Sequence, residues 1–193
     1  SQSPDHKLLA WSADDKGSEY DTVRVRDIAS ECDLPDEVPD VEGAVVWSRD
    51  ATAFYYVRLD ANHRPSHVYR HRLGTPAADD ALVYEEQDSR YFVSLIELQS
   101  ARYAVIAAHD HETSECSLLD LARADAKPRL VAPRETSVRY ELEHHPDWHG
   151  EDSLVIRTNV DKAEDFKIAL APLANPAREN WRDLIPHRRG IFV

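Results

Sequence analysis

The sequence predicts an all-β protein, specifically a partial β-propeller of about four blades with four antiparallel strands each. Three observations support this fold class. Apolar runs are short and end at Pro, Asp, Asn, Ser or Gly, which is typical of strands. Long segments with helical periodicity and caps are absent, because the one Ala-rich stretch, Leu121 to Lys127, is too short. The strands also recur in groups with a period of roughly 45 to 50 residues, as in propeller blades.

The first repeat unit, approximately residues 3–40, departs from the four-strand plan. Its Ser3-Pro4-Asp5 segment matches the tight turn that follows an inner strand in the next unit. Strands are expected at Lys7 to Ser12 and at Thr22 to Ile28, with an outer strand after them. We therefore predict that the first blade lacks its inner strand.

The remaining units, approximately residues 41–88, 89–135 and 136–188, each supply four expected strands. The first of these is the clearest, because Ser48-Arg49-Asp50 forms a tight turn after its inner strand. The expected strands are Ala44 to Trp47, Ala53 to Leu59, His67 to Leu73 and Ala81 to Glu85; Tyr91 to Leu98, Tyr103 to Ala108, Ser117 to Leu121 and Arg129 to Ala132; and Val138 to Glu143, Ser153 to Thr158, Phe166 to Ala171 and Trp181 to Ile185.

Residues 1–193 are thus expected to form a single propeller fragment that begins and ends inside blades. At the carboxyl end, Ile191 to Val193 resembles the start of a further inner strand. An incomplete ring leaves apolar faces and sheet edges uncovered. We therefore expect either that Ile191 to Val193 closes a small ring or that two chains associate, in preference to a lone open arc.

Composition and charge exclude several classes of protein. The formal net charge of −13 argues against a nucleic-acid partner, because such proteins place a surplus of Lys and Arg opposite the phosphates. No apolar stretch approaches the roughly 20 residues of a membrane helix, so no membrane partner is expected. Two cysteines, Cys32 and Cys116, lie far apart, which favours a reduced, cytoplasmic protein.

Two groups of polar residues are candidates for an interface. His109, Asp110, His111 and Glu112 form the richest cluster, and they fall where a strand ends and a loop begins. Two histidines on one strand face could share a metal, but hydrogen bonding in the turn or at a domain interface is the favoured interpretation. Arg70 and Arg72 flank His71, where they could pair with Glu85 or Glu86 across the sheet or bridge to another domain. Adjacent His144 and His145 would face opposite ways, which disfavours joint ligation.

The chain resembles the N-terminal propeller domain of the prolyl oligopeptidase family, and within it oligopeptidase B. The likeness covers nearly the whole sequence in order. It is carried by Ser3-Pro4-Asp5, Leu8-Leu9-Ala10, Val45-Val46-Trp47-Ser48, Phe54-Tyr55-Tyr56, Asn62-His63-Arg64-Pro65, Val68-Tyr69-Arg70-His71, His109 to Glu115, Leu130-Val131-Ala132-Pro133-Arg134, Tyr140 to His145 and Asp165-Phe166-Lys167-Ile168.

This resemblance implies a two-domain cytosolic serine peptidase, in which the propeller caps an α/β-hydrolase domain and admits only short peptides. For oligopeptidase B, it implies cleavage after Arg or Lys, with which an acidic cap is compatible. No G-x-S-x-G nucleophile elbow occurs in the sequence. We therefore expect no catalytic, cofactor or metal residue in this chain, and we expect the chain by itself to be inactive. The alternatives are a stand-alone propeller that binds a protein partner and, less favoured, an enzyme that acts through His109 to Glu112.

Overall fold

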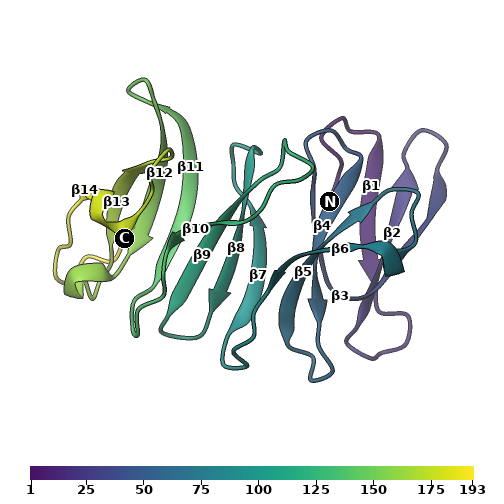
Figure 1. Ribbon diagram of the computed structural model, residues 1–193, viewed down its shortest axis with the longest axis horizontal. Coiled ribbons are helices and arrows are strands. Elements are labelled where there is room, and N and C mark those ends of the chain that lie inside the picture. The colour runs from purple at the N-terminus through teal and green to yellow at the C-terminus, as the bar shows by residue number, and fades with distance from the viewer.

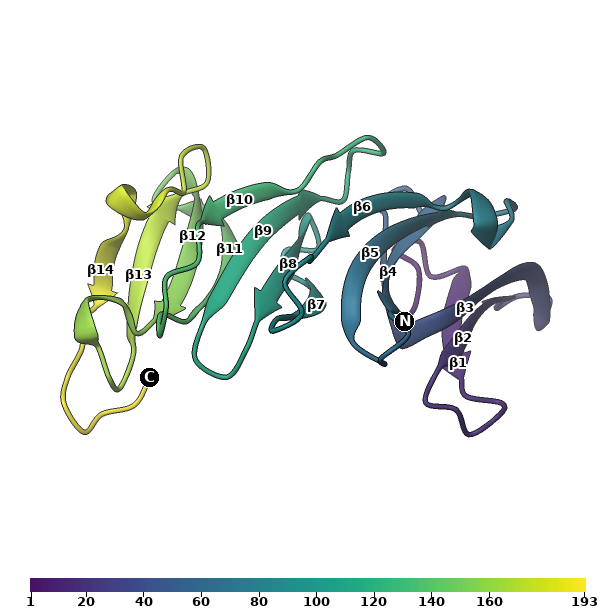
Figure 2. The ribbon, with the colours of Figure 1, turned by 60° about the horizontal axis from the view of Figure 1, so that its bottom comes forward.

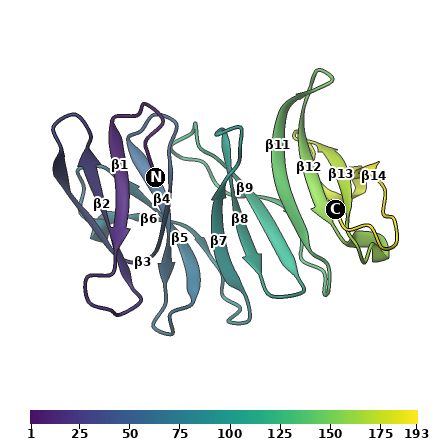
Figure 3. The same ribbon diagram turned by 180° about the vertical axis from the view of Figure 1, so that it is seen from behind.

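The computed structural model describes residues 1–193 and consists almost entirely of β-strands (Figure 1). The strands form three antiparallel sheets, and the only helical segments are three short 3-10 turns. The sheets stand side by side in an open, curved row (Figures 2 and 3). The all-β prediction is therefore confirmed. None of the helical segments is long or apolar enough to cross a lipid bilayer.

One sheet has six strands in sequence order, and the other two have four strands each. The six-stranded sheet contains β1 (Leu8–Ala13), β2 (Asp21–Asp27), β3 (Cys32–Trp47), β4 (Ala53–Leu59), β5 (Pro65–Arg72) and β6 (Ala81–Glu85). The second contains β7 (Phe92–Glu97), β8 (Tyr103–His109), β9 (Ser114–Asp120) and β10 (Arg129–Ala132), and the third contains β11 (Tyr140–Trp148), β12 (Glu151–Thr158), β13 (Lys167–Pro172) and β14 (Arg182–Ile185). The 3-10 turns are η1 (Ala77–Asp79), η2 (Val160–Lys162) and η3 (Arg178–Asn180).

Strand β3 is 16 residues long and joins two units into the six-stranded sheet. Its first half pairs with β2, where Val38 lies opposite Val23, and its second half pairs with β4. We call β1, β2 and the first half of β3 blade 1, and the second half of β3 with β4 to β6 blade 2. Blade 3 is β7 to β10, and blade 4 is β11 to β14.

The first half of β3 is the expected outer strand of blade 1, although no bounds could be predicted for it, because Pro35 and Pro39 stand among acidic residues there. In the structure this half has a partner on one side only, so a proline can present its missing N–H to the open side of the sheet at no cost. Asp36 and Val38 are nevertheless buried on either side of the exposed Glu37, so the alternation of a half-buried strand is present between the prolines.

Gly43 sits where β3 passes from one blade to the next. Its φ of +112° is a conformation that only glycine adopts without strain. An added Cβ would lie 2.5 Å from Oδ2 of Asp21 and 3.2 Å from Oγ of Ser12, two side chains that hydrogen-bond to each other at 2.8 Å. The bend between the blades therefore depends on the absence of a side chain at this position.

We expect Gly43→Ala to lower the free energy of unfolding by roughly 2–3 kcal/mol, from backbone strain and the broken Ser12–Asp21 contact. Urea denaturation followed by tryptophan fluorescence would measure the loss. Gly17→Ala is the matched control, because Gly17 also has positive φ but has no atom within 4 Å of the added Cβ. Equal losses in the two variants would show that the close approach at Gly43 contributes nothing.

The turns after the inner strands confirm the repeat between blades 1 and 2. Ser3 Oγ donates to Asp5 at 2.7 Å and accepts from the backbone N–H of Leu8 at 2.9 Å. Ser48 Oγ donates to Asp50 at 2.6 Å and accepts from the backbone N–H of Ala53 at 3.1 Å. The same polar side chains thus close the same turn in both units, as the sequence predicted.

Three apolar cores lie between successive blades. Side chains of β4 alternate between two of them: Phe54 and Tyr56 pack toward blade 1, whereas Tyr55 and Val57 pack toward blade 3. Because both faces of β4 are buried, its sequence begins with a continuous run of apolar residues. The third core joins blades 3 and 4 through residues that include Leu118, Tyr140 and Leu154.

The two ends of the chain do not meet, and the predicted closure into a small ring is wrong. Ile191 to Val193 folds back on blade 4, where the Phe192 ring lies 5.5 Å from that of Phe166 and the Val193 carbonyl accepts from Arg157 at 2.6 Å. At the other end Gln2 forms a bridge to Leu9 in β1, so a short remnant of the inner strand of blade 1 is present. The chain is an open arc with its termini on different blades (Figure 1).

Candidate interaction surface

The antiparallel strands give the arc two faces formed by different connections. Face 1 carries the turns after the inner strands and the loops before the outer strands, such as residues 48–52, 73–80, 98–102 and 121–128. Face 2 carries the turns between the second and third strands, such as residues 60–64 and 110–113, and the connections between blades at 86–91 and 133–139. A partner that covers the arc from above or below would meet one of these faces.

Arg70 and Arg72 lie at the end of β5 that leads to face 1. The predicted pairing with Glu85 or Glu86 is wrong, because the register places Ala81 opposite Arg70. Glu85 instead lies opposite His67, with 3.6 Å between His67 Nε2 and Glu85 Oε1. Arg72 is exposed, whereas Arg70 is half-buried and its Nε atom has no hydrogen-bond partner.

His71, between these arginines, forms a buried ionic cluster that the sequence did not reveal. Its Nε2 lies 3.0 Å from Asp36 of blade 1, and its Nδ1 lies 2.8 Å from Asp80 in the loop before β6. All three side chains are at most 2% exposed. Each ring nitrogen of His71 thus has a buried carboxylate as its partner. The cluster ties blade 1 to blade 2.

His109 is the last residue of β8, and the residues from Asp110 to Glu112 lie in the β8–β9 turn on face 2. His109 Nε2 lies 2.8 Å from Ser94 Oγ of β7. Asp110 accepts hydrogen bonds from the backbone N–H groups of Glu112 and Thr113 at 2.8 and 2.6 Å, and these bonds lower the pKa of Asp110. His111 is exposed. Asp110 thus stabilises the turn through hydrogen bonds, whereas a contact of this cluster with another domain stays a prediction.

The structure does not bring the two predicted groups together. Arg70 and Arg72 belong to the face 1 end of blade 2, and His109 to Glu112 belong to face 2 of blade 3. His109 ends a strand and His111 lies in the turn, so they do not share a strand face. No group of three or more His, Cys, Asp or Glu side chains is arranged to hold a metal ion.

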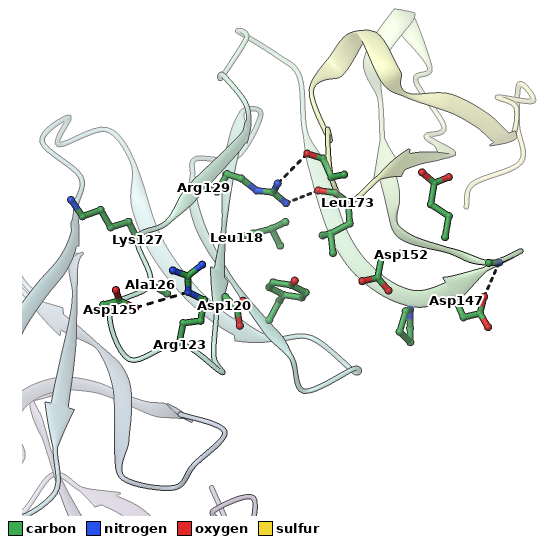
Figure 4. A pocket seen from close by; sticks show the side chains of 15 residues that line it. Leu118, Asp120, Arg123, Asp125, Ala126, Lys127, Arg129, Asp147, Asp152 and Leu173 are labelled. Atoms are coloured by element: carbon green, nitrogen blue, oxygen red, sulfur yellow. Dashed lines mark hydrogen bonds and ion pairs between the residues drawn. The ribbon is translucent and has the colours of Figure 1, made fainter.

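Face 1 also carries a polar cavity between blades 3 and 4 that the sequence did not predict (Figure 4). Its volume is about 1180 Å³. The β9–β10 loop, with Asp120 and Arg123, forms one wall, and the end of the β11–β12 hairpin, with Asp147 and Asp152, forms the other. Leu118, Tyr103 and Leu173 supply its apolar surface. These walls are some thirty residues apart in sequence, so no local pattern could reveal them.

On face 2, the side chain of Arg134 stabilises the connection between blades 2 and 3. Its Nη2 donates to Glu86 and, at 3.0 Å, to Glu115, and its guanidinium lies 4.1 Å from the centre of the Tyr91 ring. Burial opposes the charge, but the bonds to Glu115 and Glu86 more than offset it and raise the pKa of Arg134. Arg64 adds a hydrogen bond to the Tyr91 carbonyl at 2.9 Å.

Comparison with known proteins places this arc in a family. The model of the prolyl oligopeptidase N-terminal β-propeller domain matches residues 1–193, which is the whole chain. The chain belongs to the prolyl oligopeptidase family. Within this family, dipeptidyl aminopeptidase BI of Pseudoxanthomonas mexicana is 36% identical over 99% of the chain and 26% of that protein. Protease 2 of Moraxella lacunata is 30% identical over 88% of the chain and 24% of that protein.

Solved structures of the prolyl oligopeptidase family share this arc. Oligopeptidase B from Leishmania major superposes with a TM-score of 0.87 at 32% identity, over 96% of the chain and 25% of that protein. Oligopeptidase B from Trypanosoma brucei, with covalently bound antipain, gives 0.84 at 34% identity, over 97% of the chain and 26% of that protein. The resemblance seen in the sequence is confirmed, and the chain spans about a quarter of the relatives it matches.

Proposed function

We propose that this chain is the non-catalytic propeller portion of a serine oligopeptidase, which restricts access of peptides to a Ser-Asp-His triad in an α/β-hydrolase domain outside these residues. The observation that carries the proposal is the match of all 193 residues to the propeller domain of a peptidase family. Relatives with about four times the length of the chain leave room for a catalytic domain. The substrates are short peptides, cleaved after basic residues in the cytoplasm.

The net charge of −13 supports basic peptides as substrates, because an acidic cap raises the local concentration of cationic peptides. The catalytic domain is the partner of the chain, and Arg70, Arg72 and His109 to Glu112 are the candidate contacts with it. Arg72 and His111 fit such a role best, since both are exposed. No cofactor or metal takes part in the proposed chemistry.

The alternative is a stand-alone scaffold that binds a protein partner through one face. Exposed apolar side chains of the open arc help to distinguish the scaffold from the fragment of a larger protein. Phe192, Ile96 and Leu82 are each more than half exposed. Such surfaces favour self-association of an isolated arc. A stable monomer of residues 1–193 in light scattering would support the scaffold, whereas an oligomer would support a fragment that requires further blades.

Hydrolysis of a chromogenic peptide that ends in Arg tests the proposal. We expect the full-length protein to cleave this peptide and residues 1–193 alone to release no chromophore above the buffer rate, since the triad lies elsewhere. The same Arg site placed in a folded carrier protein should resist the full-length enzyme. Cleavage by residues 1–193 alone, or equal cleavage of peptide and carrier, would overturn the proposal.

A further inference from the structure

Strand β7, the inner strand of blade 3, has a free hydrogen-bonding edge. It is the terminal strand of its sheet and pairs with β8 on one side only, in an unbroken register. The backbone N–H of Leu98 donates to the Tyr103 carbonyl at 3.0 Å, and the backbone groups of successive residues in an antiparallel strand point to opposite edges. The backbones of Ser94 and Ile96 therefore bond to β8. The N–H and C=O groups of Leu95, between them, point to the free edge, where an extended chain can pair with them.

The same strand exposes two large apolar side chains. Phe92 is 46% exposed and Ile96 is 53% exposed, and by the alternation of the strand both lie on the side of the sheet that faces blade 4. The other inner strands, which are the second half of β3 and β11, expose no large apolar side chain. Inner strands border the central channel of a propeller. An apolar group that enters the channel would therefore meet β7.

A pocket beside β7, which we call the inner pocket, can hold an apolar side chain. It lies between blades 3 and 4 and has a volume of about 380 Å³. Its apolar surface comes from Ile96, Leu98, Val105, Ala107 and Leu142. Ser94 also lines it, with its Oγ 2.8 Å from Nε2 of His109. Mostly apolar walls with a few polar groups are typical of binding sites. A chain paired with β7 would place alternate side chains beside Ser94 and Ile96, at this pocket.

Two carboxylates lie at the face 1 end of β7. Glu97 is exposed and ends the strand. Glu143 extends from β11 to the turn after β7, where its Oε1 accepts from the backbone N–H groups of Gln99 and His144 at 3.1 and 2.8 Å. These donors are neutral, so the negative charge of Glu143 is not compensated by them. This end of the edge is therefore complementary to a cationic side chain.

We infer that β7 binds peptides by strand addition. An extended segment pairs with the free edge of β7, an apolar side chain of that segment enters the inner pocket beside Ile96, and a basic side chain lies near Glu97 and Glu143. The inference rests on the proposed function, since that function brings short basic peptides into the propeller. Main-chain hydrogen bonds of this kind give affinity, whereas a pocket for alternate side chains gives specificity. The site thus selects peptides that carry an apolar residue close to the basic one.

The test uses the full-length protein and the peptide acetyl-Thr-Leu-Thr-Leu-Thr-agmatine, which has a guanidinium group but no peptide bond after it to be cleaved. Calorimetry measures its affinity. Methylation of one alternate set of peptide nitrogens should weaken binding by about tenfold, because those N–H groups face β7, and methylation of the other set should have little effect. Replacement of both leucines by serine should also weaken binding by about tenfold, because the apolar contact with the inner pocket is lost.

Ile96→Thr tests the pocket, because it removes apolar surface but keeps a β-branched side chain that suits a strand. We expect this variant to bind the peptide about fivefold more weakly than the unmodified protein. Leu82→Thr is the matched control, since Leu82 is 51% exposed on β6, an outer strand of another blade, and should leave the affinity unchanged. A photoreactive leucine in the peptide should crosslink to residues 94–98, 105–109 or 139–142, mapped by mass spectrometry.

Three results would overturn the inference. They are equal affinities of the Ile96→Thr and Leu82→Thr proteins, equal effects of the two methylation sets, and crosslinks only to residues that lie away from the inner pocket. The first and third are the expected results if the guanidinium alone anchors the peptide elsewhere in the full-length protein. Because no bond of the peptide after a basic residue is available for cleavage, failure of binding at β7 and failure of peptide hydrolysis are separate results.

Discussion

Replacement of His71 by alanine is expected to lower the free energy of unfolding by about 3–5 kcal/mol, since it leaves two buried carboxylates without their imidazole partner. Asp36 and Asp80 are both at most 2% exposed on their side chains, and each lies within hydrogen-bond distance of the imidazole. Tyr56 also donates to Asp80 at 2.8 Å, so the loss extends to a third strand. Urea denaturation of the full-length protein, followed at the propeller transition, would measure the change.

Two further variants show how much of the lost unfolding free energy comes from the charges of this cluster and how much from their burial. Asp36→Asn keeps an oxygen that can accept from His71 and from the backbone N–H of Gly74, which donates at 2.6 Å, so we expect a loss of only about 1 kcal/mol. Asp33→Asn, on the same strand as Asp36, removes an exposed pair with Arg26 of β2 and should cost much less than His71→Ala. A His71→Ala loss no larger than that of Asp33→Asn would show that the buried cluster does not hold blades 1 and 2 together.

The strands were predictable because they are short, and because the apolar runs and turn residues that indicate them lie within a few residues of each other. The run from Ala53 to Val57 has apolar residues on both faces, and the turn at Ser48 and Asp50 recurs at Ser3 and Asp5 with the same hydrogen bonds. The outer strand of blade 1, which is the first half of β3, was expected, but its bounds were not predictable from such signals. Its prolines are tolerated only because that half of the strand has a free edge, which is a property of the sheet and not of the segment.

Residues that lie close in sequence and share one turn could be interpreted correctly, as at Asp110. Clusters formed by residues of different blades could not be predicted from the sequence. The cluster at His71 needs Asp36, which is 35 residues away in the first half of β3, a strand for which no bounds could be predicted. The predicted pairing of Arg70 failed for a related reason, since the partner of a strand residue depends on a register that the sequence leaves open. The polar cavity between blades 3 and 4 could not be predicted either, because its lining residues come from separate parts of the sequence.

Replacement of Arg134 by methionine is expected to lower the free energy of unfolding by about 2–4 kcal/mol. The variant keeps the length of the stem over Tyr91 but removes the cation between Glu86 and Glu115, whose side chains are only 7% and 19% exposed. Loss of one partner from a largely buried pair is costly because the remaining charge is left without compensation. The connection between blades 2 and 3 should therefore open first, which hydrogen exchange of residues 86–91 would detect as lost protection.

The control for Arg134 is Arg90→Met in the same connection. Arg90 also pairs with an acid, Asp88, at 2.6 Å and lies 5.7 Å from the Tyr91 ring, but its side chain is 76% exposed, so we expect a much smaller loss than for Arg134→Met. Adding Glu86→Gln to Arg134→Met should restore about 1–2 kcal/mol, because it removes the buried charge that the first change left unpaired. If the double variant is less stable than Arg134→Met alone, the cost lies in lost packing over Tyr91, and the ionic account of this connection is wrong.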